Sequence, residues 1–239
     1  SYQAKINMIA KSEAEVINNL LQDSVAVVAT TVTLTDNQLS HFENKKIKGK
    51  ITVLGFDAIV LISNKAAMDS IVDYNEIQNL FDKKNTTIKG MVFSNPNTSN
   101  LSFLSNKFNA DIKNNTKIFS LDNQISVLEY ISKNPGYIGA ISLYDYLHTS
   151  AKDQVYKENI QRLNVKIQDQ KTKKIQVVNA DKSFLANNLY PFRRPIYLLN
   201  YQGKSGLGMG FASFAAGDIG QLIIDKANLL PVRIPPREI

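Results

Sequence analysis

Residues 55–64 read Gly-Phe-Asp-Ala-Ile-Val-Leu-Ile-Ser-Asn. The apolar run at its centre, Ala58–Ile62, has the length of a β-strand and is far shorter than the roughly 18 residues of a membrane span. An aspartate precedes this run, and a serine and an asparagine follow it. On both sides of the stretch, short strand-like runs alternate with amphipathic helical segments, which is the pattern of an α/β protein.

The elements around this strand are predicted from hydrophobic periodicity and from helix-capping residues. Strands are predicted at 4–9, 24–31, 91–93, 137–143 and 195–200, with a β-hairpin at 165–178. Helices are predicted after Ser12, at 73–81, at about 98–108, at 125–133 and at 211–227, the last with a break near Gly217. Ser12 and Glu15 have the spacing of a capping box, and Val16 and Leu20 then begin the apolar stripe of a core-facing helix.

The composition narrows the classes of function. The chain has 239 residues, of which 44% are hydrophobic and 21% charged, as in a soluble globular protein. It has no cysteine, which excludes disulfides, thiolate metal sites and cysteine nucleophiles. His41 and His148 have no metal-ligating partner at close spacing, and there is no P-loop and no Gly-x-Ser-x-Gly elbow. The sequence therefore predicts no cofactor, no metal site and no enzymatic activity.

The charge of the chain favours anionic partners. Lysine and arginine number 28 against 21 aspartates and glutamates, a formal charge of +7. The densest basic clusters, at 45–50 and 171–174, lie in turn-like segments without interleaved aromatic residues. This pattern gives little support to nucleic-acid binding, and no nucleic-acid partner is predicted.

Four segments occur in an order that points to one family. They are 55–64, followed at a short distance by the helix at 73–81; 130–139, Tyr-Ile-Ser-Lys-Asn-Pro-Gly-Tyr-Ile-Gly; 188–197, Asn-Leu-Tyr-Pro-Phe-Arg-Arg-Pro-Ile-Tyr; and 211–231, with its Phe-x-x-Phe, Gly-Gln and final proline. Together they resemble the phosphate-binding-protein branch of the type II periplasmic solute-binding proteins. In that family, the segments similar to 55–64 and 188–197 cross between two lobes.

The resemblance implies an α/β, two-lobed type II periplasmic-binding-protein-like fold with a discontinuous first lobe. Lobe 1 is expected to hold residues 1–57 plus 196–239, and lobe 2 residues 58–195, joined by interlobe crossing strands. Members of the family begin with a further strand and helix, including a hydroxyl-rich ligand loop, before the segment that aligns with Ser1. The chain is therefore expected to lack that first strand and helix.

The resemblance also implies a function. Such proteins are periplasmic or associated with the cell envelope. They bind phosphate or a similar small oxyanion, and their partners are the membrane subunits of an ABC transporter or another complex of the cell envelope. The alternative is a structural or interaction protein that retains the fold without binding a ligand. Two arginines of the family pattern are missing, because Val32 stands at one place and Phe93-Ser94 at the other, and this favours the alternative.

The candidate ligand contacts lie where strands end and helices begin, since free amides and the helix dipole at such places suit an oxyanion. Residues Asn97, Thr98, Ser99 and Asn100 follow a predicted strand and open a helix. In the family, a Ser-Gly-Thr sequence at the corresponding place contacts phosphate. The same residues could instead only cap the helix, and both interpretations remain open.

Three further positions complete the candidate site. Thr30 and Thr31 end a strand at a place where the family often has a ligand contact. Asp57 could accept a hydrogen bond from a protonated ligand oxygen, or it could fix the hinge. Arg193 or Arg194 could supply the missing positive charge, or form a structural salt bridge.

Overall fold

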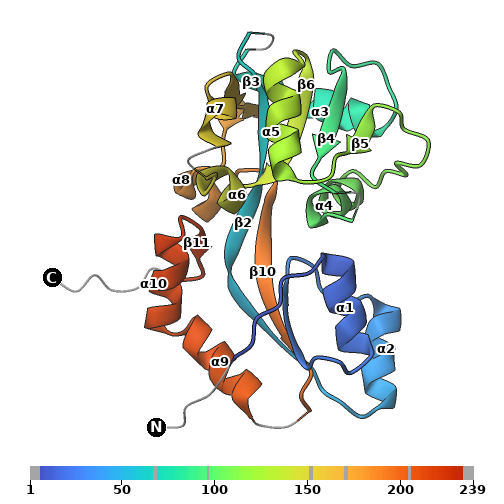
Figure 1. Cartoon of the computed structure of the whole chain (residues 1–239), viewed down its shortest axis with the longest axis vertical. Helices are drawn as coiled ribbons and strands as arrows, with labels where there is room; N and C mark the ends of the chain where they lie inside the picture. The colour runs from blue at the N-terminus through green and yellow to red at the C-terminus, as the bar shows by residue number, and fades with distance from the viewer. Residues whose placement is uncertain are drawn as a thin grey trace, which may run out of the picture. The chain divides into compact units, whose positions relative to one another are not determined.

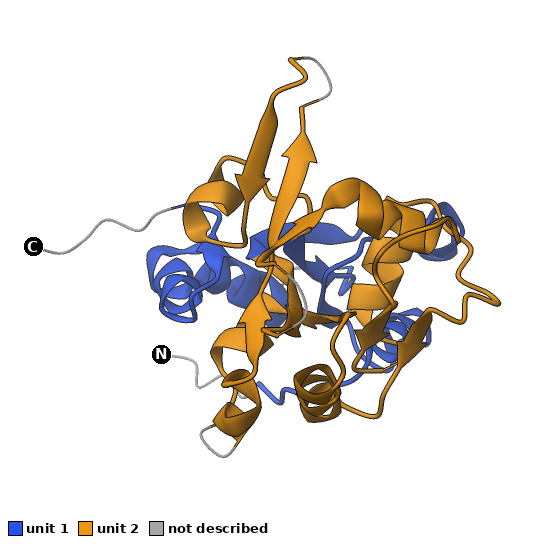
Figure 2. Cartoon of the chain, turned by 90° about the horizontal axis from the view of Figure 1, so that it is seen from above, with its two compact units in different colours: residues 1–56, 194–239 blue, residues 57–193 orange. Residues whose placement is uncertain are grey.

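In the computed structural model, residues 6–66, 69–95, 97–150, 153–169, 172–203 and 206–233 are described. The chain forms two compact units, which Figure 2 distinguishes by colour. Unit 1 is Ser1–Phe56 with Arg194–Ile239, and unit 2 is Asp57–Arg193. The chain passes from unit 1 to unit 2 within the long strand β2 (Lys50–Asn64) and returns at the start of β10 (Arg193–Asn200), both labelled in Figure 1.

Unit 1 contains a small sheet built from β1 (Val27–Thr30), β10, the first part of β2 and β11 (Leu230–Pro231). β1 runs antiparallel to β10, with Val27 opposite Asn200, and β11 runs antiparallel to β2, with Leu230 opposite Phe56. The helices of this unit are α1 (Glu13–Leu21), α2 (Asp36–Asn44), α9 (Leu207–Ala216) and α10 (Asp218–Lys226). The elements of the unit thus come from both ends of the chain.

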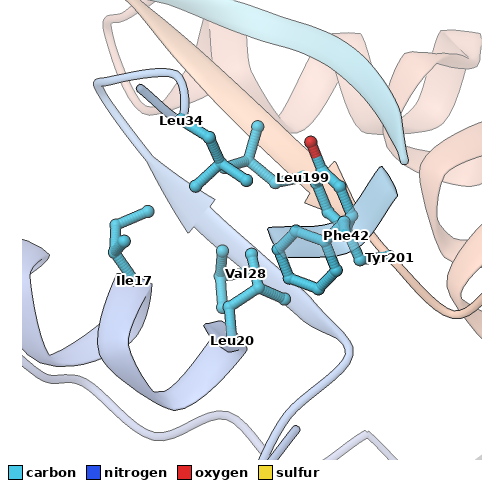
Figure 3. Packing of buried hydrophobic residues seen from close by; sticks show 7 residues of the cluster. All are labelled: Ile17, Leu20, Val28, Leu34, Phe42, Leu199 and Tyr201. Carbon is cyan, nitrogen blue, oxygen red and sulfur yellow. The ribbon is translucent and has the colours of Figure 1, made fainter. Parts of the chain in front are cut away.

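The core between α1, α2 and the sheet explains why α1 forms where it does. Its first turn is closed by the predicted capping box of Ser12 and Glu15, which is confirmed. Its inner face then buries Ile17 and Leu20 against the strands. Figure 3 shows the cluster in full: Ile17, Leu20, Val28, Leu34, Phe42, Leu199 and Tyr201. This packing fixes the position of the α1 N-terminus relative to the end of β1.

The last two helices of unit 1 form a bent pair. α9 ends at Ala216 and α10 begins at Asp218, so the break predicted near Gly217 is confirmed. Among the described residues, no single helix is long and apolar enough to cross a membrane, and only this pair, bent by 62°, passes that test when its two members are joined. Phe214, Ile219 and Ile223 of this pair are exposed.

Unit 2 is a larger α/β body built on two sheets. In its main sheet the second part of β2 pairs with β6 (Tyr137–Ser142) and β7 (Ile160–Arg162), and β4 (Gly90–Phe93) lies parallel to both β6 and β5 (Ile118–Ser120). The smaller sheet has the order β3 (Ile71–Asp73), β8 (Asn164–Gln168), β9 (Ile175–Val178). The helices are α3 (Tyr74–Phe81), α4 (Ser99–Lys107), α5 (Gln124–Lys133), α6 (Leu143–Leu147), α7 (Gln154–Lys157) and α8 (Lys182–Ala186).

The apolar run Ala58–Ile62 of β2 lies in the core of unit 2. Every side chain from Ala58 to Ile62 has an exposed fraction of 0%. The predicted helices at 73–81 and 125–133 and the predicted hairpin at 165–178 are confirmed, because they correspond to α3, α5 and the β8–β9 pair. Burial of this strand on both faces explains its unbroken apolar sequence.

The strand predicted at 4–9 is wrong over its described part. Residues 6–9 have no strand structure, and Ile6, Met8 and Ile9 are exposed. A β-strand exists only when a second strand satisfies its amides and carbonyls. Within the described ranges no strand pairs with these residues, since β1 ends the sheet order and its neighbour is β10. An apolar sequence alone was therefore not sufficient to form a strand.

Tyr190 links the segment before β10 to β2 inside unit 2, and it provides a first test. Its hydroxyl donates to the carbonyl oxygen of Ile59 at 2.8 Å, while the Ile59 amide donates to the carbonyl of Phe192 at 3.0 Å. Tyr190→Phe should lower the free energy of unfolding at neutral pH by about 1–2 kcal/mol, because a buried acceptor loses its donor. Urea unfolding measures this, with the exposed Tyr144→Phe, expected to be neutral, as the control.

The same variant has a predicted pH dependence. Burial raises the pKa of the Tyr190 phenol, so the folded state holds its proton at a pH where the unfolded chain has released it. The stability that this phenol contributes is complete below its unfolded pKa of about 10 and is lost as the pH rises above it. The difference in unfolding free energy between the native chain and Tyr190→Phe should therefore shrink above pH ~10. A difference independent of pH would contradict the role of the buried phenol.

Candidate ligand-binding site

Thr30 and Thr31 stand at the end of β1, and in unit 1 the structure brings them together with Glu13, the first residue of α1. One carboxylate oxygen of Glu13, Oε1, accepts hydrogen bonds from the Thr30 hydroxyl at 2.8 Å, the Thr31 amide at 2.9 Å and the Thr31 hydroxyl at 2.8 Å. The Thr30 oxygen in turn accepts from the amide of Val32 at 3.3 Å. The donors of these threonines thus converge on one point, and the Glu13 carboxylate accepts their hydrogen bonds.

Sequence reasoning missed Glu13. It assigned the first turn of α1 to the capping box of Ser12 and Glu15 and gave Glu13 no role. A signal was available, because a glutamate in the first turn of a helix is followed, one helix and one strand later, by a pair of threonines. Only the packing of α1 against β1 shows that these side chains meet.

Residues 97–100 of unit 2 follow β4 and include the N-cap and first two residues of α4, and most of their hydrogen bonds are local. The Asn97 amide donates to Oδ1 of Asn95 at 2.7 Å, and Thr98 is the N-cap of α4, its hydroxyl oxygen accepting from the Asn100 amide at 3.4 Å. Asn100 is 5% exposed, and its side-chain amide donates to the carbonyl of Ala140 in β6 at 3.3 Å. Asn100 therefore fixes α4 to the sheet, while Thr98 and Ser99 stand half-buried at the helix start.

The first turn of α4 has no acidic residue, which is also true of α5, α7, α8 and α9. Acidic residues occupy the first turns of α1, α2 and α3, where they compensate the positive end of the helix dipole, but none is present in the first turn of α4. The Thr98 hydroxyl donates to no acceptor among the described residues. This end of α4 therefore offers amides, a hydroxyl and a partial positive charge that no carboxylate of the first turn compensates.

Asp57 and the two arginines lie where the chain changes units. Asp57 is 5% exposed in β2 and is the first residue of unit 2. Arg193 is the last residue of unit 2 and donates to the side-chain oxygen of Asn188 at 2.9 Å, while burial lowers its pKa. Arg194 is the first residue of the returning part of unit 1 and is 4% exposed. The two arginines thus have different surroundings despite being adjacent.

A pocket of about 460 Å³ lies in unit 2, and none of these residues lines it. Its walls come from the start of α3 and from the β8–β9 hairpin, and Asp73 and Lys166 form an ion pair of 2.7 Å on them. Burial by itself would raise the pKa of Asp73. Hydrogen bonds from Lys166 and from the Asn75 amide outweigh this effect, and the pKa is lowered. Within the described residues, no three histidine, aspartate or glutamate side chains are grouped to hold a metal ion.

Comparison with protein families gives one match that extends over most of the chain. The model of the PBP superfamily domain matches residues 1–218. None of the curated proteins is similar enough in sequence to count as a match.

Solved structures give further matches. A protein from Clostridium perfringens, described as a phosphate ABC transporter substrate-binding protein with bound phosphate, has 16% identity and a TM-score of 0.66, over 91% of this chain and 83% of its own. An ABC-type phosphate transport receptor from Vibrio cholerae has 12% identity and a TM-score of 0.66, over 91% and 84%. PstS from Borrelia burgdorferi has 16% identity and a TM-score of 0.58, over 92% and 85%. At these identities the likeness concerns the fold.

Proposed function

Because the chain belongs to the PBP superfamily and has its two-lobed α/β fold, we propose that it is a solute-binding protein that holds a small oxyanion such as phosphate. In this proposal it works in the periplasm or at the cell envelope, and it passes the solute to the membrane subunits of an ABC importer. The structurally similar proteins from Clostridium perfringens and Vibrio cholerae, which are described as phosphate-transport proteins, support the choice of phosphate as the first ligand to test.

The observation that carries the proposal is the N-terminus of α4. The first turn of α4 holds no acidic residue, and the Thr98 hydroxyl and the first amides of the helix are the kind of donors that bind oxyanions. Thr98, Ser99 and Asn97 are accordingly the ligand contacts proposed in unit 2, and Thr30 and Thr31 those proposed in unit 1. Asn100 and Asp57, each 5% exposed, complete the set of proposed ligand-binding residues.

The affinity for phosphate is expected to be modest. A phosphate ion must exchange its hydration shell for protein donors. Hydrogen bonds with a charged protein group contribute about 1.5–3 kcal/mol each, and neutral pairs about 1 kcal/mol. The proposed contacts are hydroxyls and amides, and Val32 stands where the family pattern has an arginine. We therefore expect a dissociation constant above about 1 µM.

Isothermal titration calorimetry of the full chain with phosphate tests this proposal. Thr98→Val should weaken binding about threefold to tenfold, because one hydroxyl contact is lost. Thr116→Val, at an exposed threonine of the same unit, should leave the affinity unchanged. Sub-micromolar binding that survives Arg193→Ala and Arg194→Ala would contradict the expected weakness. The absence of both a binding heat and a thermal shift with phosphate, sulfate and molybdate would contradict the function itself.

A second candidate function has one specific observation in its favour. The donors of Thr30 and Thr31 are already satisfied by the Glu13 carboxylate. A protein that retained the fold as a structural or interaction module, without a ligand, would satisfy its polar groups internally in this way. The absence of any binding heat or thermal shift with phosphate, sulfate and molybdate would favour this candidate function.

A further inference from the structure

The cluster at the end of β1 has the geometry of an oxyanion site. Three donors, two hydroxyls and one backbone amide, converge on a single oxygen, Oε1 of Glu13, at 2.8 to 2.9 Å. Thr30 is 6% exposed, so this donor set is built into the fold. Hydroxyls and amides that converge on one negatively charged oxygen are what proteins present to one corner of a bound oxyanion. Here the negatively charged oxygen belongs to the chain itself.

The groups that donate hydrogen bonds to the Glu13 carboxylate are neutral. In the part of the chain that the structure describes, no lysine or arginine forms an ion pair with this carboxylate, and its bonded partners are the two threonines. An incoming anion would need the same donors and would meet the negative charge of Glu13 beside them, with which no described lysine or arginine forms an ion pair. The Glu13 carboxylate therefore competes with any anion for Thr30 and Thr31.

Unit 2 contains a second cluster of the same chemistry. Oε2 of Glu76, in the first turn of α3, accepts from the Thr86 hydroxyl at 2.7 Å, the Thr87 amide at 2.8 Å and the Thr87 hydroxyl at 3.1 Å. The hydrogen bonds from Thr86 and Thr87 lower the pKa of Glu76. None of these residues is a proposed ligand contact. The second cluster is therefore a matched control for the first.

We propose that Glu13 is the residue that limits the affinity for oxyanions, because its carboxylate occupies the donor set of Thr30 and Thr31 from within. The inference rests on the proposed function, since it takes these threonines as ligand contacts. An oxyanion can use the donors of Thr30 and Thr31 only after the Glu13 side chain has turned away. Removing the carboxylate leaves the donors in place and removes the competing charge.

The test is calorimetric titration of the full-length Glu13→Ala chain with inorganic phosphate, repeated with sulfate. Phosphate should bind at least about tenfold more tightly than to the native chain, which corresponds to about 1.4 kcal/mol. Glu13→Gln, which removes the charge but keeps a side chain of the same shape, should give a smaller gain. Glu76→Ala empties the equivalent cluster in unit 2 and should leave the phosphate affinity at its native value. The gain of Glu13→Ala should disappear when Thr31→Val is added.

The possible outcomes separate this inference from the proposed function. Tighter binding by Glu13→Ala supports the inference even if the native chain is silent, and in that case the proposed transport of oxyanions fails. Native binding that Glu13→Ala does not improve overturns the inference and leaves the function standing. A gain that survives Thr31→Val, or that Glu76→Ala shares, shows a general effect of charge and also overturns it. If Glu13→Ala does not fold, the absence of any gain in Glu13→Gln overturns the inference.

Discussion

Replacing Gln221 by leucine is expected to lower the free energy of unfolding of unit 1 by about 3–4 kcal/mol. Gln221 has an exposed fraction of 0% and uses both ends of its amide. Its nitrogen donates to the carbonyls of Leu54 and Ala215, both at 2.9 Å, and its oxygen accepts from the amides of Val232 at 2.7 Å and Arg233 at 3.3 Å. One side chain thus connects α10 to α9, to β2 and to the segment after β11.

Leucine has a similar volume, so the substitution creates no cavity, and its cost comes from backbone groups that lose their partners. Urea unfolding followed by circular dichroism measures the loss. Gln22→Leu, at an exposed position of the same unit, is the control and should change the stability by less than about 0.5 kcal/mol. Equal unfolding midpoints for the two variants would show that water replaces these bonds at little cost.

A methyl group at Gly220 should be about as damaging as the loss of Gln221, whereas a methyl group at Gly210 should be stabilising. A Cβ at Gly220 would lie 2.4 Å from the carbonyl oxygen of Ala215 and 2.5 Å from both its Cα and the carbonyl oxygen of Phe214. Because all these atoms are backbone, α9 and α10 must separate to relieve the contact. Gly220→Ala should therefore cost about 3 kcal/mol.

Gly210 is the matched position. It lies in α9, and a Cβ there would find no atom within 4 Å. Gly210→Ala should raise the unfolding free energy by up to about 1 kcal/mol, because alanine is the better helix former. The two variants add the same methyl group to neighbouring helices. A loss of unfolding free energy therefore indicates a clash in packing, and a gain indicates the better helix propensity of alanine. If both Gly220→Ala and Gly210→Ala lower the unfolding free energy, this account of Gly210 is wrong. If neither changes it, the close approach at Gly220 is contradicted.

Much of the fold could be predicted because its signals are local. The strand at 58–62 is apolar throughout, the capping box of Ser12 and Glu15 depends on residues three apart, and Gly217 interrupts an otherwise helical run. The resemblance to a family then supplied the order of elements. The predicted strand at 4–9 failed because pairing is not local, and no sequence pattern shows whether a partner strand is present.

The candidate site could be predicted only in part, for the same reason. Thr98 and Asn100 were proposed as ligand contacts from a strand–turn–helix pattern, and the structure shows that Thr98 caps α4 and that Asn100 bonds to β6, while their role as contacts stays a prediction. Glu13 was missed because its partners lie 17 and 18 positions away, at a distance that depends on how α1 packs on β1. A carboxylate at the start of a helix normally indicates only a favourable interaction with the dipole.

The strand β2 has a consequence for how this protein can vary in length. It pairs with β11 at Phe56 and with β6 from Ile59 onward, so the two pairings leave only residues 57 and 58 between them. Adding or deleting one residue there would shift one pairing by a single position and turn its side chains to the opposite face. A change in the length of this stretch is therefore incompatible with keeping both pairings, and the burial of Asp57 and Ala58 also restricts which side chains fit there. Insertions are compatible with the fold before Lys50 or beyond Asn64, where the strand has ended.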